Sequence, residues 1–218
     1  MTVDDERRRP REAQRVRDMP APRKSEGAAG GVAQRIFAWP YRAILAFLLW
    51  TGIRPWELTL LSLLLNIVSG ALILAGSWAW AGVALILGGT FDVMDGSVAR
   101  HRGEVRRSGA FMDSVLDRVS DMILFGCLYW YLAGQGEEFA ATLALITLVV
   151  SLAVSHVRAE AEAAKVVLTE GMFQRLERVI ALAVGLLVPG MMLPVLIVLA
   201  VLGTATALQR SFLAVRGA

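Results

Sequence analysis

The sequence contains few of the residues on which disulfide-bonded proteins and thiolate or imidazole metal sites depend. Among its 218 residues there are one cysteine, Cys127, and two histidines, His101 and His156. A single cysteine excludes an intramolecular disulfide framework, and no cysteine or histidine lies at a metal-ligand spacing. The net charge is only +3, so the total charge favours no particular partner, and we expect no nucleic-acid partner.

Lysine and arginine are absent from three long stretches, residues 55–99, 119–157 and 179–209. The chain is also 56% hydrophobic, with a mean hydropathy of +0.57. Crossing the hydrocarbon core of a bilayer takes about 20 apolar residues, so each stretch is long enough for one or two helices. The sequence therefore predicts an all-α, polytopic membrane protein.

Six transmembrane helices are predicted between residues 57 and 212, preceded by an interfacial amphipathic helix at 35–53. The aromatic residues of this first segment, with Pro40 and Arg42 inside it, suit the headgroup region better than a span. Basic residues occupy alternate connections, so the positive-inside rule places both termini on the cytoplasmic side of the cell membrane. The six spans are predicted at 57–75, 78–99, 110–132, 140–164, 175–188 and 192–212.

The chain divides into a tail, residues 1–34, and a membrane domain, residues 35–218. The tail mixes eight basic residues with acidic residues, three prolines and a glycine-rich run, which predicts a disordered basic segment in the cytoplasm. Two interpretations stay open for it: attachment to anionic lipid, or simple solvation.

Five aspartates interrupt the apolar sequence around residues 92–121. A carboxylate at the centre of a membrane is unfavourable by about 2.5 to 3.5 kcal/mol even on the lower scales, so several together need a cation or a wet cavity. Spacing places four of them in two pairs, one on each of two helices, and the short basic connection predicts that these helices are antiparallel neighbours. Hard oxygen ligands favour Mg²⁺ or Mn²⁺, and we expect two ions. The five are Asp92, Asp95, Asp113, Asp117 and Asp121.

Small residues and one cation accompany these carboxylates. Gly96, Ala99 and Gly109 leave backbone open to a bulky ligand, and Arg100 could hold a phosphate that the metal ions also bind. This combination indicates a diphosphate site. The alternative is that the aspartates only cap helices and pair with nearby arginines, while the glycines only pack helices.

The whole stretch resembles the signature of the CDP-alcohol phosphotransferase family, also called CDP-alcohol phosphatidyltransferases. Its eight fixed positions over 26 residues are all filled, and the likeness extends from about residue 35 to the C-terminus. The resemblance implies transfer of a phosphatidyl or other substituted phosphoryl group from a CDP-linked lipid to an alcohol, with release of CMP. The eight positions are Asp92, Asp95, Gly96, Ala99, Arg100, Gly109, Asp113 and Asp117.

The resemblance also implies roles for these residues. Asp92, Asp95 and Asp113 would hold the metal ions and Asp117 would contribute to that shell. Together with the first three aspartates, Gly96, Ala99, Arg100 and Gly109 would bind the CDP group. Asp117 would be the catalytic base that accepts the proton of the attacking hydroxyl. Asp121 would order either Arg118 or a group that contacts the ligand.

The acceptor alcohol depends on a second charged region. Segments 158–162 and 174–178 resemble the prokaryotic phosphatidylinositol phosphate synthase subgroup, whose acceptor is inositol 1-phosphate. Glu160 and Leu176 depart from the subgroup pattern, so glycerol 3-phosphate, as used by phosphatidylglycerophosphate synthases, and an unphosphorylated polyol stay open. The cations predicted to bind the acceptor are Arg118, Arg158, Lys165, Arg175 and Arg178.

A function of another class also places aspartates inside membrane helices. A divalent-cation transporter or channel would use them to line its path. It gives no reason for the glycines, and Arg100 beside the site would oppose cation entry. Family resemblance further predicts a homodimer, with a lipid donor arriving from the membrane and the acceptor arriving from the cytoplasm.

Overall fold

The protein is described here by a computed structural model that covers residues 30–166 and 175–217, with side chains described for 41–166 and 175–216. The chain forms two compact units, residues 1–53 and 54–218. In the first unit, α1 spans Gly30–Thr51 and Gly52 follows it with a positive φ of 77°. The helix thus begins five residues before the predicted 35. Val32, Ala33 and Gln34 contain no helix breaker, so helical structure can extend upstream through them. Residues 1–29 of the predicted tail lie outside the described residues.

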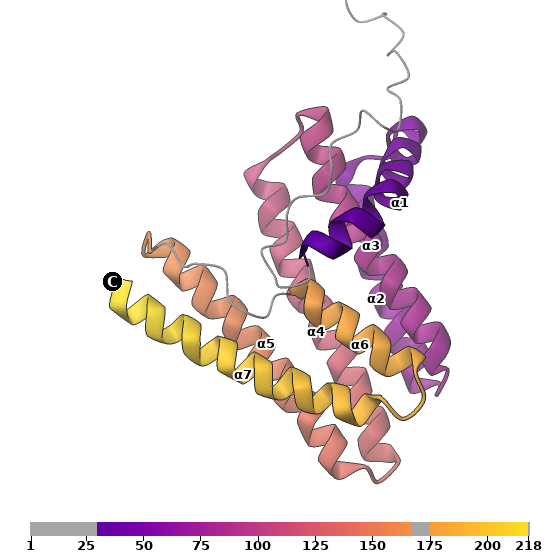
Figure 1. Cartoon of the computed structure of the whole chain (residues 1–218), viewed down its shortest axis with the longest axis vertical. Helices are drawn as coiled ribbons and strands as arrows, with labels where there is room; N and C mark the ends of the chain where they lie inside the picture. The colour runs from indigo at the N-terminus through magenta and orange to yellow at the C-terminus, as the bar shows by residue number, and fades with distance from the viewer. Residues whose placement is uncertain (1–29, 167–174, 218) are drawn as a thin grey trace, which may run out of the picture. The chain divides into compact units, whose positions relative to one another are not determined.

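The described part of the second unit contains six helices, and no strand is found there (Figure 1). Each helix overlaps one predicted span, and the bounds differ by at most five residues. The largest difference is at α7, which continues to Gly217. The helices are α2 (Pro55–Leu74), α3 (Trp78–Arg102), α4 (Arg107–Gly134), α5 (Glu138–Ala163), α6 (Arg175–Leu187) and α7 (Met192–Gly217).

Local sequence explains where these helices begin and end. Pro55 starts α2, where a missing N–H is tolerated, and the Arg54 backbone N–H donates to Glu57 Oε2 at 2.8 Å. Gly103 ends α3 with a left-handed φ of 68°, and the next backbone N–H, of Glu104, reaches the Ala99 carbonyl at 2.9 Å. Such caps keep the connections short.

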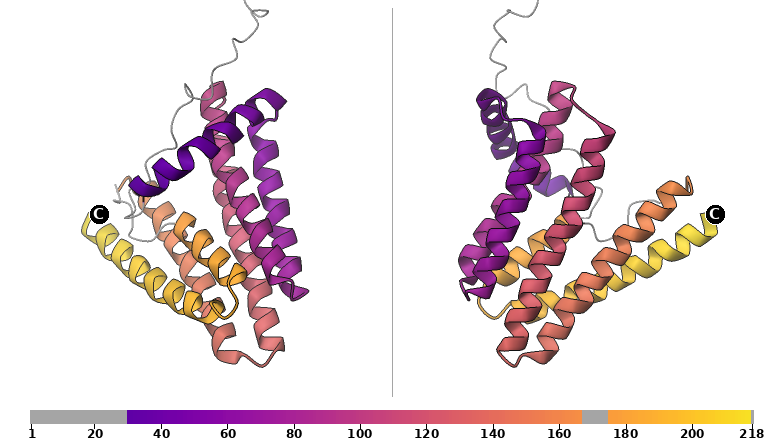
Figure 2. Two further views of the ribbon diagram at one scale, coloured as in Figure 1. Left: turned by 45° about the vertical axis from the view of Figure 1, so that its right-hand side comes forward. Right: turned by 180° about the vertical axis from the view of Figure 1, so that it is seen from behind.

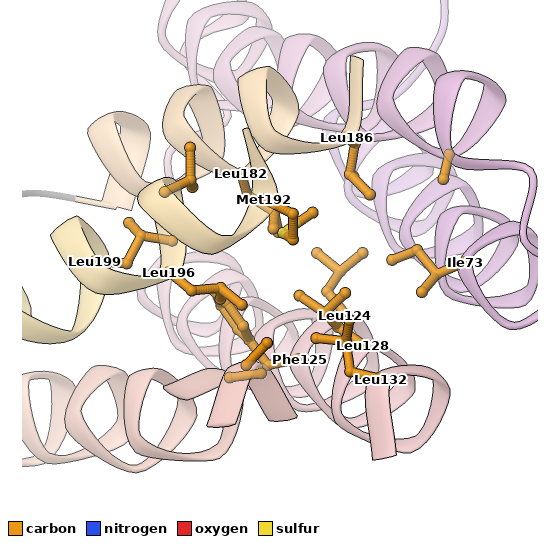
Figure 3. Close-up of a cluster of buried hydrophobic side chains, with 14 of the residues drawn as sticks. Ile73, Leu124, Phe125, Leu128, Leu132, Leu182, Leu186, Met192, Leu196 and Leu199 are labelled. Carbon is orange, nitrogen blue, oxygen red and sulfur yellow. The ribbon is translucent and has the colours of Figure 1, made fainter. Parts of the chain in front are cut away.

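The helices of this unit pack in six pairs: α2 with α3 and α4, α5 with α4 and α7, and α6 with α3 and α7. Both views of Figure 2 show α5 and α7 running alongside one another. An apolar core joins α2, α4, α6 and α7, where Ile73, Leu128, Leu186 and Leu196 point toward one another (Figure 3). The core residues of α4 lie in its C-terminal half, whereas its three aspartates come before them.

Large apolar side chains also cover the outside of these helices. Leu64, Val149 and Val201 are more than half exposed, as expected of surfaces that face lipid. Four described helices are long and apolar enough to cross a membrane: α2, α3, α5 and α7. The several apolar helices are those of a membrane protein. α4 has the length but contains five charged residues in its first 15, and α6 has 13 residues.

Candidate active site

Three carboxylates from two helices converge at one end of the second unit. Asp92 and Asp95 lie on α3 and Asp113 lies on α4, and one oxygen from each falls within 4.8 Å of the others. Asp95 is buried, and the other two are partly buried. Carboxylates this close repel one another unless a cation lies between them, and hard oxygen ligands suit a divalent cation. The group therefore fits a metal ion.

The short connection 103–106 predicts that α3 and α4 are neighbours whose aspartates face each other, and their carboxylates do converge. The two backbones are not in direct contact, since no Cα atoms of these helices, both fully described, lie within 8 Å of each other. Instead α2 packs against both of them. The aspartate side chains thus extend from two separated backbones into a shared space, and that spacing leaves room for an ion and its ligand.

A hydroxyl group from α2 orients one of the three carboxylates. Thr59 Oγ1 donates a hydrogen bond to Asp95 Oδ2 at 2.6 Å. A hydrogen bond to one carboxylate oxygen fixes the side chain's orientation and leaves its other oxygen for a metal ion. Thr59 was not singled out in the sequence, because its partner is 36 residues away and only the fold brings them together.

Asp117 lies one turn beyond Asp113 and makes a different contact. Its Oδ1 is 2.9 Å from Arg175 Nη1, and the same nitrogen donates to Asp92 Oδ2. Arg175, the first residue of α6, therefore bridges α3 and α4. Asp117 is outside the group of three converging oxygens, but it is joined to that group through this arginine.

A pocket of about 470 Å³ opens beside Asp113 and Asp117. Its walls come from α4, α5, α6 and α7. Two of its arginines, Arg178 and Arg210, are each only 8% exposed, which is unusual for this residue type. The arginines lining it are Arg118, Arg158, Arg175, Arg178 and Arg210, and the acidic residues are Asp113, Asp117, Asp121 and Glu162.

Hydrogen bonds hold several of these pocket arginines in place. Arg118 Nη1 donates to the carbonyl and hydroxyl of Ser114, both at 2.7 Å, and its Nη2 donates to the Ser155 carbonyl at 3.2 Å. Arg178 Nη2 lies 3.3 Å from Asp121 Oδ2. Of the two interpretations of Asp121, ordering Arg118 has no support in these contacts, since Asp121 contacts Arg178 instead. Fixed guanidinium groups of this kind are suited to binding a phosphate.

Comparison with known proteins identifies the family to which this chain belongs. The family model described as CDP-alcohol phosphatidyltransferase matches residues 53–210. The chain belongs to the CDP-alcohol phosphatidyltransferase family. The predicted family is therefore confirmed.

Several relatives of this chain are named as inositol phosphate lipid synthases. The phosphatidylinositol phosphate synthase of Corynebacterium glutamicum is 38% identical over 145 residues, which is 65% of this chain and 66% of that protein, just under two thirds. The archaetidylinositol phosphate synthase of Pyrococcus horikoshii is 33% identical over 163 residues, which is 74% of this chain and 83% of that protein.

Solved structures agree with the sequence relatives. The phosphatidylinositol phosphate synthase of Mycobacterium tuberculosis with CDP-DAG bound superposes with a TM-score of 0.72 at 28% identity, covering 79% of this chain and 92% of that one. A second crystal structure of that enzyme, in complex with manganese and citrate, also has a TM-score of 0.72 and covers 87% of that chain.

The family's signature residues outside the carboxylate group lie on the same ends of α3 and α4. Gly96 packs against Arg100, since a Cβ atom there would be 3.2 Å from Arg100 Nη1, and Arg100 Nη2 donates to Ser97 Oγ at 3.0 Å. Gly109 differs, because a Cβ atom there would meet no described atom within 4 Å. Helix packing therefore does not account for Gly109, whose backbone is open on one side. Ala99 lies in the last turns of α3.

The fold brings four of the five predicted acceptor-binding residues together in the pocket. Arg118, Arg158, Arg175 and Arg178 line the pocket. Lys165 is not among the described residues that line it, because α5 ends at Ala163 and Lys165 follows in a left-handed conformation with φ of 59°. Arg210 was considered only as a topological marker in the sequence. The sequence feature that could have singled out Arg210 is its position directly after the long stretch 179–209, which has no lysine or arginine.

Proposed function

We propose that this protein transfers the phosphatidyl group of CDP-diacylglycerol to inositol 1-phosphate and releases CMP. The observation that carries the proposal is the pocket lined by five arginines directly beside Asp113 and Asp117. A phosphorylated acceptor needs such cations, whereas an unphosphorylated polyol does not. Two relatives support this acceptor: one is named phosphatidylinositol phosphate synthase and the other archaetidylinositol phosphate synthase, and both names specify an inositol phosphate lipid as the product.

The departures from the inositol phosphate subgroup do not oppose this acceptor. Glu160 is exposed and is not among the described residues that line the pocket, so its carboxylate does not face a bound phosphate there. Leu176 lines the pocket but carries no charge. Glycerol 3-phosphate also carries a phosphate, so direct competition between it and inositol 1-phosphate is needed to distinguish the two acceptors.

The converging carboxylates supply the metal site of this proposal. Asp92, Asp95 and Asp113 hold a divalent ion, Mn²⁺ or Mg²⁺, and Asp117 completes a site for two ions. A metal ion held there would supply positive charge for the diphosphate of the donor and for the charge that develops on the transferred phosphoryl group. Gly96, Ala99, Arg100 and Gly109 bind the CDP group at the ends of α3 and α4.

Asp117 acts as the base in the transfer. The acceptor hydroxyl attacks the phosphorus of the phosphatidyl group, its proton goes to Asp117, and the bond from that phosphorus to the oxygen of CMP breaks. Arg175, 2.9 Å from Asp117, orients the carboxylate from α6. The acceptor pocket opens beside Asp117, which supports a proton transfer at this position.

The membrane arrangement belongs to the same proposal. Six spanning helices, α2 to α7, and the interfacial helix α1 make up the membrane domain, which with α1 begins at Gly30 instead of the predicted residue 35, and the basic tail precedes it. Both termini and the active site face the cytoplasm at the cell membrane, because the basic residues lie at the ends of the helices that carry the site. We also propose a homodimer, by analogy with the family.

The test is CMP release by purified protein with CDP-diacylglycerol, Mn²⁺ or Mg²⁺, and a panel of acceptors. We expect release with inositol 1-phosphate, none after chelation of the metal, and none from Asp113→Asn or Asp117→Asn variants that still insert and purify normally. Absence of CMP release with every acceptor, together with cation flux in liposomes, would establish the transporter instead. Wild-type rates in either variant would refute the site.

A further inference from the structure

Three buried side chains from three helices meet at the wall of the arginine-lined pocket. Asp121 of α4 is 7% exposed, Ser151 of α5 is 2% exposed and Arg178 of α6 is 8% exposed. Ser151 Oγ donates to Asp121 Oδ2 at 2.5 Å, and the same oxygen lies 3.3 Å from Arg178 Nη2. We call this set the Ser151–Asp121–Arg178 chain.

The geometry of this chain indicates a function beyond helix packing. A buried ion pair is unfavourable to desolvate and is stabilising only with good geometry and further hydrogen bonds, so it is not a simple way to hold helices together. The Asp121–Arg178 contact is long, at 3.3 Å, whereas the hydrogen bond from Ser151 is short. Asp121 is thus held firmly by Ser151 while it engages Arg178 only at one nitrogen.

Arg178 retains hydrogen-bonding capacity in this arrangement. An arginine carries five N–H donors, and its contact with Asp121 involves Nη2. Its Nε is buried and has no hydrogen-bond partner among the described residues. A buried donor without a partner is unfavourable, and an anion in the pocket would relieve this.

We propose that Asp121 and Ser151 are positioning residues that hold Arg178 in the orientation in which it binds the acceptor's phosphate. The inference rests on the proposed function, because it assigns Arg178 to the acceptor and not to the CDP group. Ser151 fixes the carboxylate, the carboxylate fixes the guanidinium, and the remaining donors of the guanidinium face the phosphate.

Ser151→Ala tests the chain without changing any charge. Loss of one hydrogen bond to a charged group corresponds to a change of roughly tenfold in affinity, so we expect the KM for inositol 1-phosphate to rise about tenfold. The kcat and the KM for CDP-diacylglycerol should stay at wild-type values, and Ser151→Thr should restore the acceptor KM. Ser69→Ala is the matched control, since Ser69 is also a buried serine whose hydroxyl donates a helix-to-helix hydrogen bond, at 2.9 Å to the Ala81 carbonyl.

Asp121→Asn separates positioning from simple neutralisation. The variant removes a negative charge near the pocket, which by electrostatics alone would tighten phosphate binding. If Asp121 positions Arg178, the acceptor KM rises in spite of the added positive charge. A lower acceptor KM in this variant, or a wild-type acceptor KM in Ser151→Ala, overturns the inference.

Calorimetric titration with inorganic phosphate, in the absence of CDP-diacylglycerol, distinguishes this inference from the proposed function. Weaker phosphate binding by both variants than by wild-type protein supports the positioning chain even if inositol 1-phosphate is not the substrate. If wild-type protein turns over inositol 1-phosphate but all three proteins bind phosphate equally, the proposed function is supported and the positioning role of Asp121 and Ser151 is overturned. A wild-type protein that binds no phosphate overturns the inference as well.

Discussion

At the scale of single residues, the site consists of charged groups whose partners come from other helices. The aspartates at 92, 95, 113 and 117 could be found from the sequence, because carboxylates inside apolar stretches are conspicuous. Thr59, Ser151 and Arg210 could not, since each looks like an ordinary helix residue until the fold places Thr59 and Ser151 beside carboxylates and Arg210 in the pocket wall. The sequence thus predicts which residues carry charge, while their orientation depends on tertiary contacts.

Thr59→Val should weaken metal binding while leaving the fold intact. Valine keeps the shape of threonine but cannot donate the 2.6 Å hydrogen bond to Asp95. Loss of a group that orients a metal ligand typically lowers metal affinity by about 10- to 100-fold. Direct Mn²⁺ titration, followed by electron paramagnetic resonance, measures this. The control is Thr90→Val on α3, because Thr90 donates only to the Ile86 carbonyl of its own helix. Equal Mn²⁺ affinity in both variants would show that Thr59 does not orient the ligand.

At the scale of helices, the boundaries were predictable and the pairing was not. Stretches without lysine or arginine, ended by glycines such as Gly76 and Gly103, predict each helix to within five residues. The short loop 103–106 predicts that α3 and α4 are neighbours, and their carboxylates do converge, but their backbones make no contact and α2 packs against both helices. Loop length limits how far apart two helix ends lie, but it does not determine whether the two backbones touch or a third helix packs against both.

Gly70 lies where α2 packs tightly against side chains of α4. A Cβ atom there would lie 2.9 Å from Ile123 Cγ2 and 3.0 Å from Cys127 Sγ. Overfilling such a contact is destabilising by about 1–3 kcal/mol, so Gly70→Val should lower the thermal unfolding temperature in detergent. Gly126→Ala on α4 is the control, since a Cβ atom there meets no described atom within 4 Å. A melting temperature for Gly70→Val equal to that of this control would contradict close packing of the two helices.

At the scale of the whole molecule, the basic connection 103–106 joins the same two helices, α3 and α4, that carry the converging carboxylates. With Cys127 replaced by alanine, single cysteines at Gly136 and at Gly103 report on opposite ends of the spans. We expect a membrane-impermeant maleimide added to intact cells to label residue 136 and not residue 103, because the positive-inside rule places the basic 103–106 connection in the cytoplasm. Labelling of residue 103 from outside would reverse the proposed topology.

The central claim is that the arginine-lined pocket beside Asp117 selects a phosphorylated inositol acceptor. The most direct measurement is mass spectrometry of the lipid product formed from CDP-diacylglycerol, Mn²⁺ and equal concentrations of inositol 1-phosphate and glycerol 3-phosphate. The account predicts phosphatidylinositol phosphate as the main product, with no lipid product after chelation of the metal. Phosphatidylglycerophosphate as the main product would contradict it.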